Sequence, residues 1–257
     1  MASAPQPQLP LFYKDLAPLN SRDHANYKTE TLDRAPWVVG QHAIPLTSDE
    51  FGQAHRHFPI VFSVGDEPVP LALMGLNEGV NVFVDDDGKF LEQFYLPAYV
   101  RRYPFLLARL DANSETMSLC FDPTSGLVHE DGEGTALFDG EEPAQVTKDL
   151  LQFCQNFEEA GMRTQQFVQE LKQADLLMDG EVAITRPDDP EKPYIYRGFQ
   201  MVNQEKLQDL RGDKLRTWNQ SGLLPLIYAH LYSLDLMRMV FGRQAEQGKI
   251  PAPNALA

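Results

Sequence analysis

The chain has 257 residues, of which 37 are acidic and 22 are basic, giving a net charge of −15, and 43% are hydrophobic. This size and composition allow a buried core in one large domain or two small ones. The excess negative charge repels phosphate backbones and anionic lipid, which argues against nucleic-acid binding and favours a neutral or cationic partner.

The amino terminus, MASAPQPQLP, is interrupted by prolines and lacks the basic and apolar stretches of a secretory signal. We expect residues 1–20 to form an extended arm. The longest apolar stretch, 223–241, contains His230, Asp235 and Arg238, so we expect no membrane insertion. Cys120 and Cys154 form neither a C-x-x-C pair nor a disulfide framework, although a single bond between them stays open. These features predict a cytoplasmic protein.

Short runs of β-branched and aromatic residues follow between residues 37 and 122, separated by turn residues. Such runs are typical of antiparallel strands, so we predict a largely antiparallel sheet in the N-terminal half. Asp86, Asp87 and Gly88 separate two of the runs and predict a hairpin turn. Thr47 has the character of a helix N-cap and predicts a short helix that ends near His57.

The C-terminal half has the spacing of amphipathic helices, at 145–160 and at 164–177, the second after Thr164 as a candidate N-cap. A second hairpin is predicted from 181–186 and 194–202, followed by helices at 204–211 and 223–241. The fold class is therefore α+β. We expect one domain over residues 21–241, with a sub-boundary near 140–145 left open, and a flexible tail at 242–257.

The common catalytic motifs are absent from the sequence. It contains no phosphate-binding G-x-x-x-x-G-K-[ST] loop, no zinc-binding H-E-x-x-H and no G-x-S-x-G nucleophile elbow. Gly132 and Gly134 begin a dinucleotide-like pattern, but Leu137 stands where the third glycine belongs. Asp85, Asp86 and Asp87 fit a solvated turn better than a calcium loop.

A metal centre is the sharpest enzymatic hypothesis. His129, Asp131 and His230 could supply the two histidines and one carboxylate of a non-haem iron site, or bind zinc. The alternative is a loop histidine together with a core histidine whose ring nitrogens are bonded to the backbone. His55 and His57, with His24 and His42, make a weaker zinc or copper candidate because nothing fixes their geometry.

The segment from Pro97 to Phe105 is a candidate binding surface. It places Arg101 and Arg102 between Tyr99 and Tyr103, framed by prolines in an acidic chain. Paired guanidinium groups can grip a carboxylate or an extended peptide, here with Asn77 and Asn81 as candidate additional contacts. The alternative is that the arginines neutralise the protein's own carboxylates while the tyrosines pack in the core.

This segment and its neighbours resemble the SapC family. The matching stretches are PLNSRDH at 18–24, EFGQAHRHFPIVFS at 50–63, LMGLNEGVNVFVDDDGKF at 73–90, YLPAYVRRYPFLLA at 95–108, LCFDPTSG at 119–126, EGTALFDGEEP at 133–143 and LLPLIYAHLYSL at 223–234. His55 and His57 stand where we expect small or variable residues, and His129 lies in a stretch that we expect to vary, which argues against both metal hypotheses.

The resemblance implies a bacterial protein from a family named after a locus linked to surface-layer protein, but it implies no reaction and no catalytic residue set. The leading hypothesis is a cytoplasmic, non-catalytic accessory protein without a cofactor. It would act on a peptide, protein or small-molecule partner linked to envelope or surface-protein production. The alternative is a metal-dependent enzyme similar to the non-haem iron oxygenases.

Overall fold

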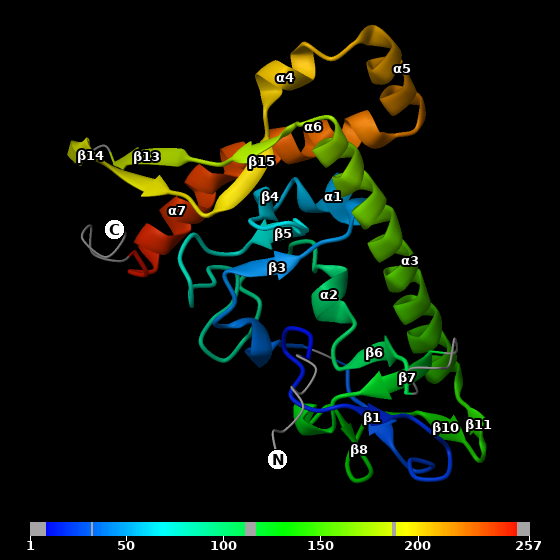
Figure 1. Ribbon diagram of the computed structural model, residues 1–257. Coiled ribbons are helices and arrows are strands. Elements are labelled where there is room, and N and C mark those ends of the chain that lie inside the picture. Colours follow the sequence, from blue (N-terminus) through cyan, green and yellow to red (C-terminus); the bar gives the residue numbers. More distant parts are fainter. Residues whose placement is uncertain (1–8, 32, 111–116, 187–188, 251–257) are drawn as a thin grey trace, which may run out of the picture. The chain divides into compact units, whose positions relative to one another are not determined.

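The computed structural model describes residues 9–31, 33–110, 117–186 and 189–250. It contains both helices and antiparallel sheets, which confirms the α+β class (Figure 1). The chain divides into two compact units, each made of two separate stretches. The first unit comprises Met1–Asp33 and Arg101–Glu159, and the second comprises Arg34–Val100 and Ala160–Ala257. The domain limits drawn from the sequence stay a prediction.

Small antiparallel sheets form the first unit. Its main sheet has the strand order β1-β7-β6, and two smaller sheets have the orders β8-β2-β9 and β10-β11. The strands are β1 (Ala17–Pro18), β2 (Lys28–Thr29), β6 (Phe105–Ala108), β7 (Ser118–Phe121), β8 (Val128–His129), β9 (Thr135–Ala136), β10 (Phe138–Asp139) and β11 (Glu142–Pro143), and the 3-10 helix η3 is Pro123–Ser125.

The core of the first unit lies between the main sheet and the beginning of helix α3 (Gln145–Gln173). Apolar side chains of β6, β7 and β10 pack with Cys154, while Val146, Leu150 and Leu151 cover them. Both cysteines are buried and free, so the disulfide left open by the sequence is not formed. Burial raises the pKa of the Cys154 thiol to about 12, which keeps it protonated and unreactive at neutral pH.

The described part of the predicted arm belongs to this unit. The Tyr13 hydroxyl donates to the Phe105 carbonyl at 2.7 Å, and the Lys14 amide donates to the Asp122 carboxylate at 2.7 Å. The pairing of β1 with β7 continues the attachment. Residues 9–20 are therefore docked on the first unit, whereas residues 1–8 lie outside the described part of the chain.

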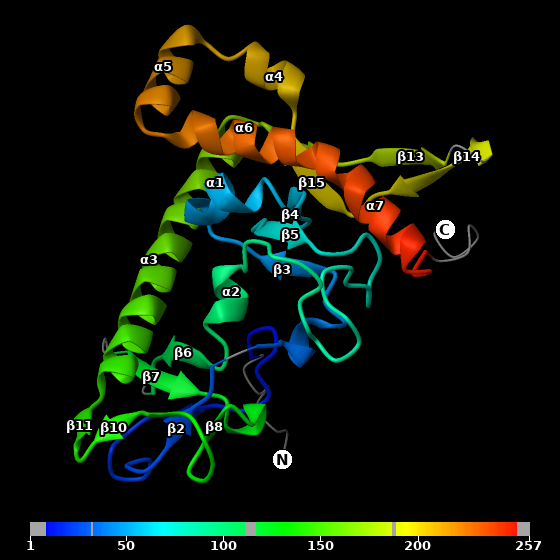
Figure 2. The ribbon, with the colours of Figure 1, turned by 180° about the vertical axis from the view of Figure 1, so that it is seen from behind.

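The second unit is built on a five-stranded antiparallel sheet of order β12-β15-β4-β5-β3. Helix α6 lies across β4 and β15, and its buried residues Ile227, His230 and Ser233 recur every third position along one face. Strands β13 and β14 form a hairpin, but the second strand predicted at 194–202 is wrong. Only residues 194–196 belong to β14, whereas 199–202 form β15, which pairs with β12 and β4. The Tyr194 and Tyr196 rings contact Phe241 of α7. Helices α4 and α5 lie on the side of α6 that faces away from the sheet (Figures 1 and 2).

The remaining bounds are as follows. The strands of the second unit are β3 (Ala43–Pro45), β4 (Ile60–Ser63), β5 (Pro70–Leu73), β12 (Leu177–Asp179), β13 (Val182–Arg186), β14 (Asp189–Tyr196) and β15 (Phe199–Val202). The helices are η1 (Pro36–Val38), η2 (Ser48–Glu50), α1 (Phe51–Ala54), α2 (Ala98–Arg101), α4 (Gln204–Gln208), α5 (Gly212–Gln220), α6 (Leu223–Ser233), η4 (Leu234–Leu236) and α7 (Met237–Glu246).

Several predicted boundaries are corrected. The two helices predicted at 145–160 and 164–177 are one helix, α3, and Thr164 lies inside it instead of capping a second helix. The stretch predicted as a helix over 223–241 is α6, η4 and α7, and α7 continues to Glu246, five residues into the predicted tail at 242–257. The predicted 86–88 turn is present, with Gly88 at φ +79°, but an isolated bridge between Val84 and Phe90 replaces the flanking strands.

Candidate functional site

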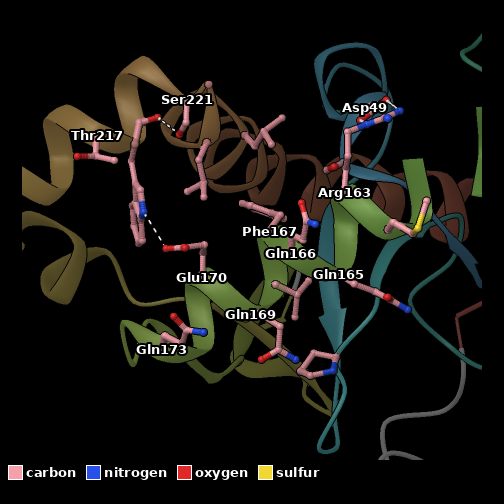
Figure 3. A pocket seen from close by; sticks show the side chains of 18 of the residues that line it. Asp49, Arg163, Gln165, Gln166, Phe167, Gln169, Glu170, Gln173, Thr217 and Ser221 are labelled. Atoms are coloured by element: carbon pink, nitrogen blue, oxygen red, sulfur yellow. Dashed lines mark hydrogen bonds and ion pairs between the residues drawn. The ribbon is translucent and has the colours of Figure 1, made fainter. Parts of the chain in front are cut away.

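A groove of about 1330 Å³ lies in the second unit (Figure 3). Its walls come from the C-terminal half of α3, from α5, from the beginning of α6 and from the turn between β4 and β5. Sites for small molecules usually have volumes of about 300–1,000 Å³. The groove is therefore large enough to take part of a polymer.

Four glutamines of α3 line the groove: Gln165, Gln166, Gln169 and Gln173. The opposite face of the same turns is buried, so helical periodicity leaves the glutamines exposed. None of the four side chains makes a hydrogen bond within the part of the chain that the structure describes. Each amide offers two N–H donors and one carbonyl acceptor without carrying charge. Such a surface suits a ligand that itself presents paired donors and acceptors.

Trp218 attaches α5 to α3 on one side of the groove. Its indole nitrogen donates to the Glu170 carboxylate at 3.1 Å (Figure 3), and only 3% of the residue is exposed. The Lys214 ammonium lies 3.6 Å from the same carboxylate and 4.8 Å from the centre of the indole ring. Because these contacts link two elements far apart in the sequence, they fix the width of the groove here.

Another part of the lining is held by an ion pair. The Arg163 guanidinium donates to both oxygens of Asp49, at 2.7 Å and 3.3 Å, and both side chains are about half exposed. Next in the sequence to this pair, the Thr164 hydroxyl accepts a hydrogen bond from the Ser48 amide at 2.7 Å and donates to the Ala160 carbonyl at 2.7 Å. These contacts attach η2 to α3 and bring Asp49 to the groove.

The lining carries more negative than positive charge. Its carboxylates are Asp49, Glu67, Glu170 and Asp213, and its cations are Arg163 and Lys214. Asp49 and Glu170 are paired within the lining, and Asp213 is paired with Arg211 at 3.1 Å. Glu67, on the β4–β5 turn, makes no ion pair or hydrogen bond among the described residues, so its charge is available to a cationic ligand group.

The hydroxyl groups of the lining are engaged by the protein itself. The Thr217 hydroxyl donates to the Asp213 carbonyl at 3.0 Å, and the Ser221 hydroxyl donates to the Trp218 carbonyl at 3.3 Å. The lining includes no histidine or cysteine among the residues that the structure describes. The Thr217 and Ser221 hydroxyls are therefore each bonded to a main-chain carbonyl of α5 instead of to a side-chain base.

The segment predicted to bind a partner, Pro97–Phe105, contains the boundary between the units, with Tyr99 in the second and Arg101 in the first. Arg102 is 6% exposed, and its guanidinium lies 4.3 Å from the centre of the Phe157 ring and 3.4 Å from Glu158. Arg101 is exposed, with its guanidinium 5.2 Å from the Phe153 ring. Of the two arginines, Arg101 is therefore the one whose guanidinium is exposed to a partner.

The tyrosines of the segment are buried, Tyr99 at 7% exposure and Tyr103 at 6%. Burial, followed by the charge of Asp122 and a hydrogen bond to it, raises the pKa of Tyr103 to about 12. The Tyr103 ring makes an edge-to-face contact with Tyr13 at 5.2 Å between centroids. The Tyr103 ring therefore supports the docked arm, and a role of either tyrosine in ligand binding stays a prediction.

Asn77 and Asn81 make internal hydrogen bonds in the second unit. Asn81 is 1% exposed, donates to the Val38 carbonyl at 2.9 Å and accepts from the Phe83 amide at 2.9 Å. The Asn77 carbonyl accepts from Gln244 at 3.0 Å. Both asparagines therefore hold the loop that contains them, and a contact with a ligand stays a prediction.

The predicted metal set is not assembled. His230 is fully buried, its Nδ1 lies 2.7 Å from the Ile60 carbonyl and its Nε2 accepts from the Val202 amide at 3.0 Å, so neither ring nitrogen can bind a metal in this arrangement. His129 belongs to the other unit, where its Nε2 lies 3.0 Å from Glu30 and Asp131 is exposed. His230 is the core histidine of the alternative interpretation.

The weaker set of four histidines is not brought together either. His24 belongs to the first unit, whereas His42, His55 and His57 belong to the second. Nδ1 of His55 is bonded to the Phe51 carbonyl of its own helical turn at 2.9 Å. Across residues 9–31, 33–110, 117–186 and 189–250, no group of three or more histidine, cysteine, aspartate or glutamate side chains is placed to hold a metal ion.

The groove residues were missed by the sequence reasoning. The signal was present in part, because Gln165, Gln166, Gln169 and Gln173 make the polar face of α3 rich in amides and poor in charge. Trp218 also stands out as a large aromatic residue in a polar stretch. What joins them to the β4–β5 turn is tertiary packing, which no local pattern in the sequence encodes.

Comparisons with known proteins identify a family. The family model SapC matches residues 19–239. No curated protein and no solved structure matches the chain. Within the described residues, no helix combines the length and the apolar character needed to cross a membrane.

Proposed function

Because the chain belongs to the SapC family over residues 19–239, we propose that it is a non-catalytic accessory protein that binds a polypeptide in the groove of its second unit. In keeping with the family name, the partner is a protein or peptide handled in the cytoplasm on its way to the cell envelope or surface. Neither a cofactor nor a metal takes part in this function.

The groove is the observation that carries the proposal. Its volume of about 1330 Å³ exceeds that of most small-molecule sites, and its lining mixes uncharged amides with apolar side chains such as Phe167 and Leu226. A polypeptide presents the same mixture of amide groups and apolar side chains. The net charge of −15 lowers the affinity for nucleic acid, which would otherwise be the competing polymer.

Peptide selection tests the proposal. A library of random dodecapeptides displayed on phage is selected against the purified chain, and the affinity of a synthetic copy of a selected peptide is measured by fluorescence anisotropy. We expect Gln169→Trp to weaken binding at least tenfold, because the larger ring fills part of the groove. The matched control is Gln155→Trp, an exposed glutamine of the same helix that does not line the groove.

Two results would overturn the proposal. One is a selection that yields no peptide, and the other is a peptide that binds Gln169→Trp as tightly as the unchanged chain. Thermal unfolding of both tryptophan variants establishes that each is folded. Arg101→Ala in the same assay tests the Pro97–Phe105 segment, because Arg101 is exposed, and thermal unfolding of this variant shows whether it is folded.

A further inference from the structure

We infer that the bound polypeptide lies along α3 in an extended conformation, with its main chain hydrogen-bonded to the row formed by Gln165, Gln169 and Gln173, and that it carries a basic side chain opposite Glu67. This inference rests on the proposed function and specifies its ligand.

The spacing of the row is the first argument. Residues four apart in an α-helix lie on the same face and are separated by about 6 Å along the axis. An extended chain presents equivalent main-chain groups to one side every second residue, which is about 6.6–6.8 Å. The mismatch, about 0.7 Å for each step, is within the reach of a flexible glutamine side chain. Three successive amides can therefore meet alternate residues of one extended segment.

The chemistry of the row is the second argument. Each peptide unit of a ligand presents an N–H donor and a carbonyl acceptor, and each glutamine amide offers the complementary pair. Gln165, Gln169 and Gln173 make no hydrogen bond with the described residues and project from α3 in Figure 3. A helical ligand would already have bonded its own main chain and would leave this row without partners. An extended ligand has free main-chain N–H and carbonyl groups that can bond to every glutamine of the row.

The charge beside the row is the third argument. Glu67 lies on the β4–β5 turn next to Pro68 and Val69, and all three line the groove together with the glutamines. Val69 is 43% exposed and gives an apolar contact for a neighbouring ligand side chain. Since the Glu67 carboxylate makes no ion pair among the described residues, a lysine or arginine of the ligand complements it. The occupant is therefore an extended, basic polypeptide segment.

Methylation of single peptide bonds tests the extended conformation. A selected dodecapeptide is synthesised as a series in which one main-chain nitrogen at a time carries a methyl group, which removes that donor. We expect affinity to fall at least tenfold at alternate positions over about five residues, and to change little between them. Gln169→Leu, which keeps the size of the side chain but removes the amide, should weaken binding about fivefold, while Gln155→Leu should leave it unchanged.

The charge is tested separately by Glu67→Gln, which should weaken a lysine-containing peptide about fivefold and leave its lysine-to-glutamine version unaffected. A methylation series without alternation, or Gln169→Leu binding as tightly as the unchanged chain, would overturn the extended conformation. If Gln169→Trp still blocks binding in that case, the groove remains the site and only the conformation of the ligand is wrong. If Gln169→Trp also fails to block, the proposed function falls as well.

Discussion

Single buried polar side chains hold together segments of the second unit that are far apart in the sequence. Glu50, 5% exposed, accepts hydrogen bonds from the Tyr95 hydroxyl at 3.0 Å and the Ala98 amide at 2.6 Å. Its other oxygen accepts from the Thr47 amide at 2.8 Å, which completes a capping box. The local cap could be predicted from Thr47, whereas the bonds to Tyr95 and Ala98 depend on the tertiary fold.

His230 has the same kind of role and predicts a pH dependence of stability. Burial lowers its pKa to about 4 from the usual 6.5, against a smaller opposite effect of the hydrogen bond to Ile60. Below pH 6.5 the unfolded chain binds a proton at this site while the folded chain stays neutral until about pH 4. The contribution of His230 to the free energy of unfolding is therefore fully present above pH 6.5 and declines as the pH falls toward 4. At pH 5 the protein has lost about 2 kcal/mol of this contribution.

Urea unfolding at pH 7 and pH 5 measures this loss. The matched variant is His230→Gln, because glutamine keeps one donor for the Ile60 carbonyl and one acceptor for the Val202 amide but does not titrate. We expect the free energy of unfolding to fall by about 2 kcal/mol more between the two pH values in the unchanged chain than in the variant. Equal falls would show that His230 is not kept neutral by burial.

At the scale of elements, helix α3 shows where local sequence patterns are overridden. Thr164 favours a helix start, so the sequence predicts a break between 160 and 164. In the structure the Thr164 hydroxyl is bonded to Ala160 and to Ser48, and the buried Phe167 and Val168 continue the packed face. Tertiary contacts therefore make one helix of 29 residues from two predicted ones.

The same helix gives a stability prediction. Gly161 lies in the middle of α3, and a Cβ added there would meet no atom within 4 Å. Alanine restricts the unfolded chain and favours the helix, so Gly161→Ala should raise the free energy of unfolding by about 0.5–1 kcal/mol. Urea unfolding followed by circular dichroism measures the change, and a destabilised variant would contradict it.

Gly180→Ala is the contrasting variant. A Cβ at this position would lie 2.0 Å from the nearest atom of the Phe199 ring, which is itself 7% exposed and packed in the core of the second unit. We expect this substitution to lower the free energy of unfolding by about 1–3 kcal/mol, because the ring must move. The two glycines should therefore respond in opposite directions to the same change.

Elements with local signals were predictable, and the site was not. Strand β13 and the turn at Gly88 follow from strand and turn residues that are neighbours in the sequence. The division of the predicted strand at 194–202 into β14 and β15 depends on pairing of β15 with β12 and β4. The groove is formed by α3, α5 and the β4–β5 turn, which only the folded chain brings together. The metal hypothesis meets the same limit, because His129 and His230 have suitable chemistry but belong to different units, which no local pattern in the sequence indicates.

At the scale of the whole molecule, the net charge of −15 acts on any ligand before contact is made. A basic segment is attracted toward an acidic protein from a distance, which raises the rate of association more than it slows dissociation. The lining of the groove has the same sign, with four carboxylates and two cations. Global and local charge therefore favour the same class of partner.

This agreement predicts a specific dependence on salt. The screening length falls from about 10 Å at 0.1 M ionic strength to about 3 Å at 1 M. For a selected lysine-containing peptide, we expect the association rate constant to fall about tenfold over this range, while the dissociation rate constant changes less than twofold. Stopped-flow anisotropy measures both constants. A peptide with its lysines replaced by glutamine should show a much flatter profile, and equal profiles would mean that short-range contacts alone select the ligand.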